Sequence, residues 1–359
     1  MAIDPREGLF EFIGFKGLRN NVDPSDFDPG DLAVALNVDI DDALSIDRRY
    51  GFGAVVVAGF DRSLFAIGPA CLGVGSNILK QILPDYSTIT LKSGLTPGRD
   101  LSYAPIADRV YWSNGVESGC VYEGVNRSWG LIVPALPTAA ATGGDLFAGR
   151  YQFAITYIRT DGQESGAARA GSIALADKGG ISLSAISAST DATIVAKAIY
   201  VSTRNGGALF RAGLITNATT TFAVREEGDP AAPLQTQFLS APPAGDFIGY
   251  FFGWMLVARG NRLYPSEPYA PELFDLRKSI PFLDRITMVA PVDDGIWVGT
   301  DSQVLWISGR SPEAWMYKVA ADYGTIPGTM NYADAELLGD GSGAGKQCVV
   351  FTTKRGICV

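Results

Sequence analysis

The sequence contains no histidine among its 359 residues. This absence excludes Ser-His-Asp and Cys-His catalysis, histidine-ligated zinc and a histidine pH switch. Cysteine is scarce as well, and Cys71, Cys120, Cys348 and Cys358 are widely spaced and form no C-x-x-C pair. That spacing argues against a disulfide framework or a zinc ribbon, so we expect four reduced, buried thiols.

Basic residues are outnumbered, since 29 Lys and Arg against 38 Asp and Glu give a formal net charge of −9. Proteins that grip nucleic acid do so with Lys and Arg side chains that displace counterions, so this balance argues against a protein of that class. It does not exclude a protein that DNA merely passes, because an acidic wall would prevent the DNA from sticking.

Long apolar runs are also missing. Residues 247–258 form the nearest candidate, and they are fewer than the roughly 20 apolar residues that a membrane-spanning helix needs. The first ten residues include Asp4, Arg6 and Glu7 and lack an apolar core, which is not the pattern of a signal peptide. We therefore expect a soluble protein with no membrane span.

The residues that are present predict a folded, all-β protein. Hydrophobic residues make up 47% of the chain and charged residues 19%, which predicts a sizeable core rather than disorder. The 42 glycines and 20 prolines separate many short apolar runs, as they do in all-β proteins with many turns.

Two stretches of the chain have the same order of residue types. Residues 108–115 (DRVYWSNG) and 261–268 (NRLYPSEP) each have a polar residue, Arg, an aliphatic residue, Tyr, a large residue and Ser before a turn. We interpret them as the same strand of a repeated unit. They lie about 150 residues apart, whereas blades of a β-repeat protein recur at roughly 40–50 residues. The spacing therefore predicts an insertion between the two copies.

Residues 137–243 have the pattern of the inserted module. A small-residue linker at 138–144 precedes a long alternating strand at 149–157, and Asp161-Gly162 then provides a hairpin turn. Long strands and about 100 residues predict an Ig-like or fibronectin-like sandwich. Without these residues the two copies lie about 46 residues apart, which matches one blade.

The predicted architecture is a β-propeller-like body interrupted by that sandwich. Residues 1–136 hold an N-terminal segment and the first blades, 137–243 the sandwich and 244–359 the remaining blades. Short strands divided by turns follow one another along 53–133, which suits four-stranded antiparallel blades. Residues 293–300 (DDGIWVGT) have a sequence pattern similar to that of propeller blades. Alternation of apolar and polar residues on both sides of residues 42–43 predicts a hairpin in the N-terminal segment.

None of the candidate catalytic, cofactor-binding or metal-binding patterns in the sequence has the arrangement that its chemistry needs. Asp293 and Asp294 are adjacent, so in a strand they would point to opposite faces and could not act as a carboxylate pair. Asp39, Asp41 and Asp42 lack the Gly and closing Glu of a calcium loop. Residues 339–346 (GDGSGAGK) lack the ending of a phosphate-binding loop. We therefore expect neither an enzyme nor a bound cofactor.

The chain resembles structural tail proteins of tailed bacteriophages. The stretches that carry the resemblance are 17–21 (GLRNN), 35–41 (ALNVDID), 49–51 (RYG), 109–115, 262–268 and 295–329. They are most similar to the β-propeller nozzle, tail tubular or packaged-DNA stabilisation proteins of short-tailed phages. The resemblance implies a virion protein, assembled in the host cytoplasm, that forms a hexameric ring at or below the head–tail connector. Its implied partners are further copies of itself, the adaptor on the portal side and the distal tail proteins, while double-stranded DNA passes through without specific binding.

This role implies a set of acidic residues facing the channel, where they would repel DNA phosphate. The candidate lumen-facing acids are Asp39, Asp41, Asp42, Asp293 and Asp294. Two other functions stay open. The first is a tail-tip protein whose 137–243 sandwich binds a host receptor or surface polysaccharide. The second, weaker alternative is a propeller glycosidase, which would need clustered Arg, Tyr and acidic side chains.

Overall fold

The structure is a computed structural model, which describes residues 14–19, 23–28, 30–41, 43–49, 59–67, 70–338 and 347–359. The chain divides into two compact units, Met1–Ala58 and Gly59–Val359. The described residues contain strands and short 3-10 helices but no α-helix. The all-β fold class predicted from the turn-rich sequence is confirmed.

The first unit contains a short parallel pair of strands and a hairpin. Its elements are β1 (Gly17–Leu18), the 3-10 helix η1 (Pro24–Asp26), β2 (Asp31–Leu32), β3 (Val38–Ile40) and β4 (Ile46–Arg48). Strand β3 pairs antiparallel with β4, as the alternation in the sequence predicts. A side-chain hydrogen bond spans the hairpin turn, because the Asp41 carboxylate accepts from the backbone N–H of Ser45 at 2.8 Å.

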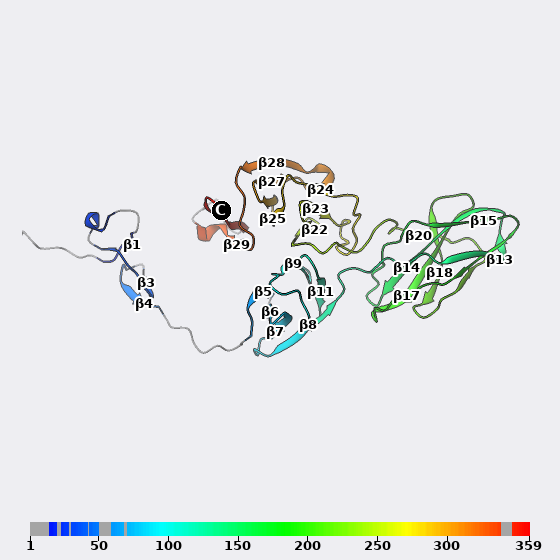
Figure 1. Ribbon diagram of the computed structural model, residues 1–359, viewed down its shortest axis with the longest axis horizontal. Coiled ribbons are helices and arrows are strands. Elements are labelled where there is room, and N and C mark those ends of the chain that lie inside the picture. Colours follow the sequence, from blue (N-terminus) through cyan, green and yellow to red (C-terminus); the bar gives the residue numbers. More distant parts are fainter. Residues whose placement is uncertain are drawn as a thin grey trace, which may run out of the picture. The chain divides into compact units, whose positions relative to one another are not determined.

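Besides the sandwich described below, the second unit contains four antiparallel sheets of four strands and one of three strands among its described residues, and in each of these five sheets the strands follow chain order (Figure 1). The first sheet is β5 (Arg62–Ile67), β6 (Ala70–Gly75), β7 (Ile78–Ile82) and β8 (Thr88–Lys92). The second is β9 (Ser102–Ile106), β10 (Arg109–Ser113), β11 (Ser118–Tyr122) and β12 (Val125–Arg127). The third is β21 (Phe247–Phe251), β22 (Trp254–Arg259), β23 (Arg262–Pro265) and β24 (Ile280–Pro281). The fourth is β25 (Ile286–Val292), β26 (Gly295–Thr300), β27 (Val304–Ser308) and β28 (Met316–Ala321), and the fifth is β29 (Asn331–Asp334), β30 (Gln347–Thr353) and β31 (Gly356–Cys358). Two 3-10 helices, η2 (Pro312–Ala314) and η3 (Ala335–Leu338), lie in the connections.

Consecutive sheets share hydrophobic cores, which is the packing of propeller blades. In strand β10, Val110 and Trp112 belong to the core shared with the first sheet, and Tyr111 belongs to the core shared with the third. In strand β25, Val289 faces the third sheet's core and Met288 faces that of the fifth. Successive strand residues point to opposite faces, so the second, third and fourth sheets each bury both faces, while the first and fifth sheets each contribute to one core among the described residues. The first strands of neighbouring sheets also lie side by side, β9 with β21 and β21 with β25.

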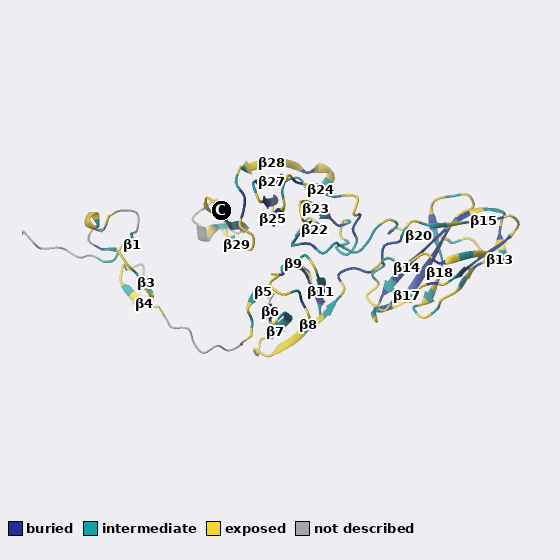
Figure 2. Ribbon diagram, viewed as in Figure 1, coloured by how far each residue is buried: buried dark blue, intermediate teal, exposed yellow. Residues whose placement is uncertain are grey.

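A β-sandwich interrupts this series between β12 and β21. Its core joins a three-stranded and a five-stranded antiparallel sheet, and Figure 2 shows buried residues along β14 and β17. The strands of the smaller sheet are β13 (Thr138–Leu146), β16 (Gly179–Ser184) and β19 (Phe222–Val224). Those of the larger sheet are β15 (Gly171–Leu175), β14 (Gly149–Arg159), β17 (Ile194–Ser202), β18 (Leu209–Thr216) and β20 (Asp229–Pro233).

The fold class predicted from sequence, a propeller-like body with an inserted sandwich, is therefore confirmed. The expected limits of the sandwich, 137 and 243, lie in the connections from β12 to β13 and from β20 to β21. That residues 137–243 form an independent domain stays a prediction.

The two similar stretches of the sequence correspond to β10 and β23, and they are not the same strand of a repeat. They lie in consecutive body sheets, as expected, but β10 is the second strand of its sheet and β23 is the third. Their likeness reflects a shared ending, since Ser113 and Ser266 are both buried and both accept a backbone N–H, from Gly245 and Met255, at 3.0 Å. The expectation of equivalent strands was wrong, because a buried serine that accepts a backbone N–H occurs at different positions in the two blades.

Space for the fully buried ring of Trp112 depends on a glycine opposite it in β11. A Cβ at Gly119 would lie 2.6 Å from the Trp112 ring and 2.7 Å from Asn126 Oδ1, the acceptor for Trp112 Nε1. We expect Gly119→Ala to lower the free energy of unfolding by about 1–3 kcal/mol through overpacking, measured by denaturant unfolding.

The matched control for this prediction is Gly143→Ala, because Gly143 is exposed in β13 and an added Cβ would contact nothing within 4 Å. We expect the control to change stability by no more than about 1 kcal/mol. Equal effects of the two substitutions would contradict the role assigned to Gly119.

Candidate functional site

The acids expected to face a channel fall into two groups in different compact units. Asp39 and Asp41 lie in the β3–β4 hairpin, where the Asp39 carboxylate is 2.6 Å from Arg49 Nε and 62% exposed. Asp42 lies outside the described residues. Among the described residues of the hairpin, no group of acids forms a metal-binding arrangement.

Asp293 and Asp294 form the turn between β25 and β26 and are both exposed. They connect the first two strands of the fourth sheet, beside the terminal pair Val292 and Gly295. The proposed role of all five acids in lining a channel stays a prediction.

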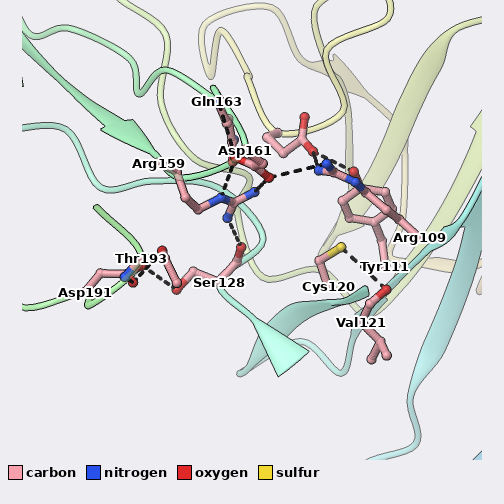
Figure 3. Close-up of polar contacts among 11 residues, drawn as sticks. Arg109, Tyr111, Cys120, Val121, Ser128, Arg159, Asp161, Gln163, Asp191 and Thr193 are labelled. Atoms are coloured by element: carbon pink, nitrogen blue, oxygen red, sulfur yellow. Dashed lines mark hydrogen bonds and ion pairs between the residues drawn. The ribbon is translucent and has the colours of Figure 1, made fainter. Parts of the chain in front are cut away.

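A partly buried ionic network joins the body to the sandwich (Figure 3). We call it the junction cluster, and it consists of Arg109, Arg159, Asp161 and Glu272. The Arg109 guanidinium reaches Asp161 Oδ2 with Nη2 and Glu272 Oε1 with Nη1, each at 3.3 Å. Strand β10 of the body thereby contacts the turn after sandwich strand β14.

The other side of the junction cluster is held by Arg159, whose side chain is only 2% exposed. Its Nη2 lies 3.1 Å from Asp161 Oδ2, and its Nη1 donates to the carbonyl of Ser128 at 2.9 Å (Figure 3). A charge this deeply buried is costly unless it is both paired and hydrogen-bonded, and Arg159 satisfies both conditions.

Electrostatics keep Asp161 ionised. Burial by itself would raise the pKa of the Asp161 carboxyl, but hydrogen bonds from Arg159 and from the backbone N–H of Gln163, with the charges of Arg159 and Arg109, outweigh it. The pKa of Asp161 therefore lies below its ordinary value. Asp161 acts as an ion-pair partner and not as a proton donor at neutral pH.

Tyr111 and Cys120 beside the cluster have suppressed ionisation. Burial, reinforced by the negative charge of Glu272, raises the pKa of Tyr111, whose hydroxyl donates to Glu272 Oε1 at 2.6 Å. Burial also raises the pKa of the Cys120 thiol to about 12, so this cysteine is a poor nucleophile.

All four cysteines are unpaired, as expected, but only Cys120 is buried. The expectation that the other three are buried was wrong. They lie half-exposed in strands β6, β30 and β31, near the margins of their sheets' cores.

A cavity of about 420 Å³ opens beside the junction cluster. We call it the junction cavity. Both parts of the second unit contribute to its wall, through Arg109, Asp161, Gly162, Gln163, Glu164, Pro233, Gln235, Thr236, Tyr269, Ala270, Glu272 and Leu273.

A second cavity, of about 430 Å³, is mostly apolar and lies beside the outer strand of the fourth sheet. Its wall includes Phe282, Leu283, Leu305 and Tyr317. Strand β28 is the outermost strand of this sheet, and five of its six residues are exposed (Figure 2). We call β28 together with Leu283 the apolar edge.

The described residues contain no group of acidic or cysteine side chains that could hold a metal ion. In the same part of the chain, no helix has the length and apolar character needed to cross a membrane. The glycine-rich stretch 339–346 lies outside the described residues.

No protein-family model matches the chain, and no curated protein matches it. Among solved structures, BBS1N in complex with ARL6DN is 9% identical, with a TM-score of 0.34 over 85% of this chain and 80% of that one. Saccharomyces cerevisiae Sqt1 is 12% identical, with a TM-score of 0.23 over 83% and 95%. Virginiamycin B lyase from Staphylococcus aureus is 11% identical, with a TM-score of 0.24 over 83% and 93%. TM-scores of this size establish no relationship, so the assignment of the fold rests on the sheet order and packing described above.

Sequence reasoning missed the junction cluster. It treated Asp161-Gly162 only as a hairpin signal and Arg109 only as part of a repeated strand. The available signal was the Arg-x-Asp-Gly order of residues 159–162, in which a turn acid follows an arginine that the strand pattern would bury. Nothing in that order identifies Arg109 as the third member.

The junction cluster predicts a pH-dependent stability. We expect Asp161→Asn to lower the free energy of unfolding by about 3 kcal/mol at neutral pH, because it leaves the buried Arg159 without its counter-charge. The folded-state pKa of Asp161 is lowered, so its contribution is present above the ordinary Asp value of about 3.9 and is lost as pH falls through the lower value.

Denaturant unfolding of the wild-type and Asp161→Asn proteins from about pH 7 to pH 3 measures this difference. Asp177→Asn is the matched control, because Asp177 is an exposed acid in the same sandwich. A difference between wild type and Asp161→Asn that grows on acidification would contradict the assignment.

Proposed function

We propose that this chain is a structural virion protein of a tailed phage. In this proposal it assembles into a ring, a nozzle or tail tube, at or below the head–tail connector, and the ring retains and conducts the genome. The supporting sequence observation is the resemblance of residues 17–21, 35–41, 49–51, 109–115, 262–268 and 295–329 to phage tail proteins. The supporting structural observation is the apolar edge.

The apolar edge has the properties of a contact between copies. Strand β28 has one unpaired edge, and Met316, Tyr317 and Val319 are 69%, 47% and 50% exposed. Leu283 beside them is 77% exposed. Edge strands are usually blunted by charge or cover, and β28 has one charged residue, Lys318. Tyr317 and Val319 lie on the same face of the strand, and exposed apolar side chains on such an edge favour association with another protein surface.

Contacts between copies through such a surface can build a ring. When a patch on one copy packs against a different patch on the next, the contacts are heterologous and close into a ring if the rotation allows. A β-body whose three inner sheets bury both faces suits a load-bearing subunit. The net charge of −9 suits a channel from which DNA must slide without sticking.

The glycosidase alternative gains little from the structure. Tyr111 and Glu272 form a hydroxyl–carboxylate pair next to Arg109, which are residue types that sialidases use. Tyr111, however, is 1% exposed and packs in the core between two sheets. A substrate could not reach its hydroxyl without opening that core.

Assembly of the purified chain tests the proposal. We expect rings in negative-stain images and a single large species by light scattering, and labelling of phage tails by an antibody against the chain. Val319→Asp is expected to shift the assembly to monomers, because it would bury an unpaired charge at each contact. Val319 is half-exposed, so the thermal midpoint should stay unchanged.

Leu214→Asp is the matched control, since Leu214 is a 54% exposed strand residue in the sandwich. Rings that persist in Val319→Asp would remove the apolar edge from the contact. Monomers at every concentration, together with unlabelled virions, would overturn the proposed function.

A further inference from the structure

The junction cavity has the size and the wall of a small-molecule site. Its volume of about 420 Å³ lies within the roughly 300–1,000 Å³ that ligand sites usually occupy. The sandwich contributes the turn at 161–164 and residues 233–236, and the body contributes Arg109 and the segment 269–273. The cavity therefore exists only when both parts are present.

Polar atoms in this wall have unmet hydrogen-bonding capacity. Both side-chain amide atoms of Gln163 and the hydroxyl of Thr236 are buried and have no hydrogen-bond partner within the described residues. Thr236 as a whole is only 6% exposed. Buried polar groups are nearly always paired, and leaving one unpaired costs about 1–3 kcal/mol. Three such atoms at one cavity point to a ligand that both donates and accepts hydrogen bonds.

The charges in the wall favour a neutral ligand. The carboxylates of Asp161 and Glu272 are already paired with Arg109, and Asp161 is paired with Arg159 as well. Glu164 Oε1 already accepts hydrogen bonds from two hydroxyls of the sandwich. An anion would face the three carboxylates of Asp161, Glu164 and Glu272 here, whereas hydroxyl groups can share the remaining lone pairs and N–H groups.

An aromatic ring stands at the rim. Tyr269 is 82% exposed, yet its position is set by its backbone, because its N–H donates to the carbonyl of Gly253 at 2.7 Å. Its ring lies over Gly253, where a Cβ would approach Tyr269 Cε1 to 2.9 Å. The lack of a side chain at residue 253 thus allows the ring to be held beside the cavity as a pre-set apolar platform.

A sugar ring matches both features, because it has an apolar face of C–H groups and a perimeter of hydroxyls. We propose that the junction cavity binds a neutral saccharide residue. Its C–H face packs on Tyr269, and its hydroxyls hydrogen-bond to Gln163, Thr236 and the carboxylate oxygens of the junction cluster. This proposal does not depend on ring assembly.

A glycan array probed with the labelled full-length protein tests the site, with neutral and sialylated glycans on the same array and titration calorimetry for the glycans that bind. We expect binding of neutral glycans. Tyr269→Ala and Gln163→Leu should each weaken that binding at least tenfold. Gly253→Ala should weaken it as well, because a Cβ there displaces the Tyr269 ring.

Tyr86→Ala is the matched control, because Tyr86 is also an exposed tyrosine in a turn, at φ 64° compared with 56° for Tyr269. It should bind like wild type, and the thermal midpoint of Tyr269→Ala should be unchanged. Binding only to sialylated glycans, no binding to any glycan, or full binding by both Tyr269→Ala and Gln163→Leu would each overturn the site. Ring formation is scored on the same samples, so failure of the saccharide site and failure of the ring are distinguishable.

Discussion

The body of this protein depends on sheets that bury both of their faces. A strand residue and its successor point in opposite directions, so Val110 and Tyr111 enter two different cores although they are neighbours in sequence. The second, third and fourth sheets are thereby each packed between the one before and the one after. At the strand ends, Ser102 bonds to the backbone of β21 and Ser113 bonds to the backbone of Gly245 just before it.

Those serine contacts explain how the body accommodates an insertion. Ser113 donates to the carbonyl of Gly245, which is 132 residues away, and Ser102 accepts from the N–H of Ile248, which is 146 residues away. The second and third sheets therefore pack directly on each other, and the sandwich leaves and returns at their junction. Its orientation there is restrained by the junction cluster, and the same contacts form the junction cavity.

Much of the fold was predictable because it follows from local pattern. Alternating strands with Gly, Pro and Asp turns predict antiparallel sheets, and the change in strand length after residue 137 predicts the inserted sandwich. The position of a strand within its blade was not predictable. Strands β10 and β23 look alike because a buried serine ends the first and directly follows the second, and this serine occurs at the second strand of one sheet and the third of another.

The sequence by itself determined the class of the protein: all-β, acidic, without histidine chemistry, and interrupted by a module. It did so because composition and a two-residue period are properties of short stretches. Only the tertiary structure decided which charges meet. Arg109 pairs with Asp161 and Glu272, and the Arg109–Glu272 contact spans 163 residues. No local pattern encodes such a pairing, because it arises when two separately patterned parts pack and their unpaired charges must be neutralised at the interface.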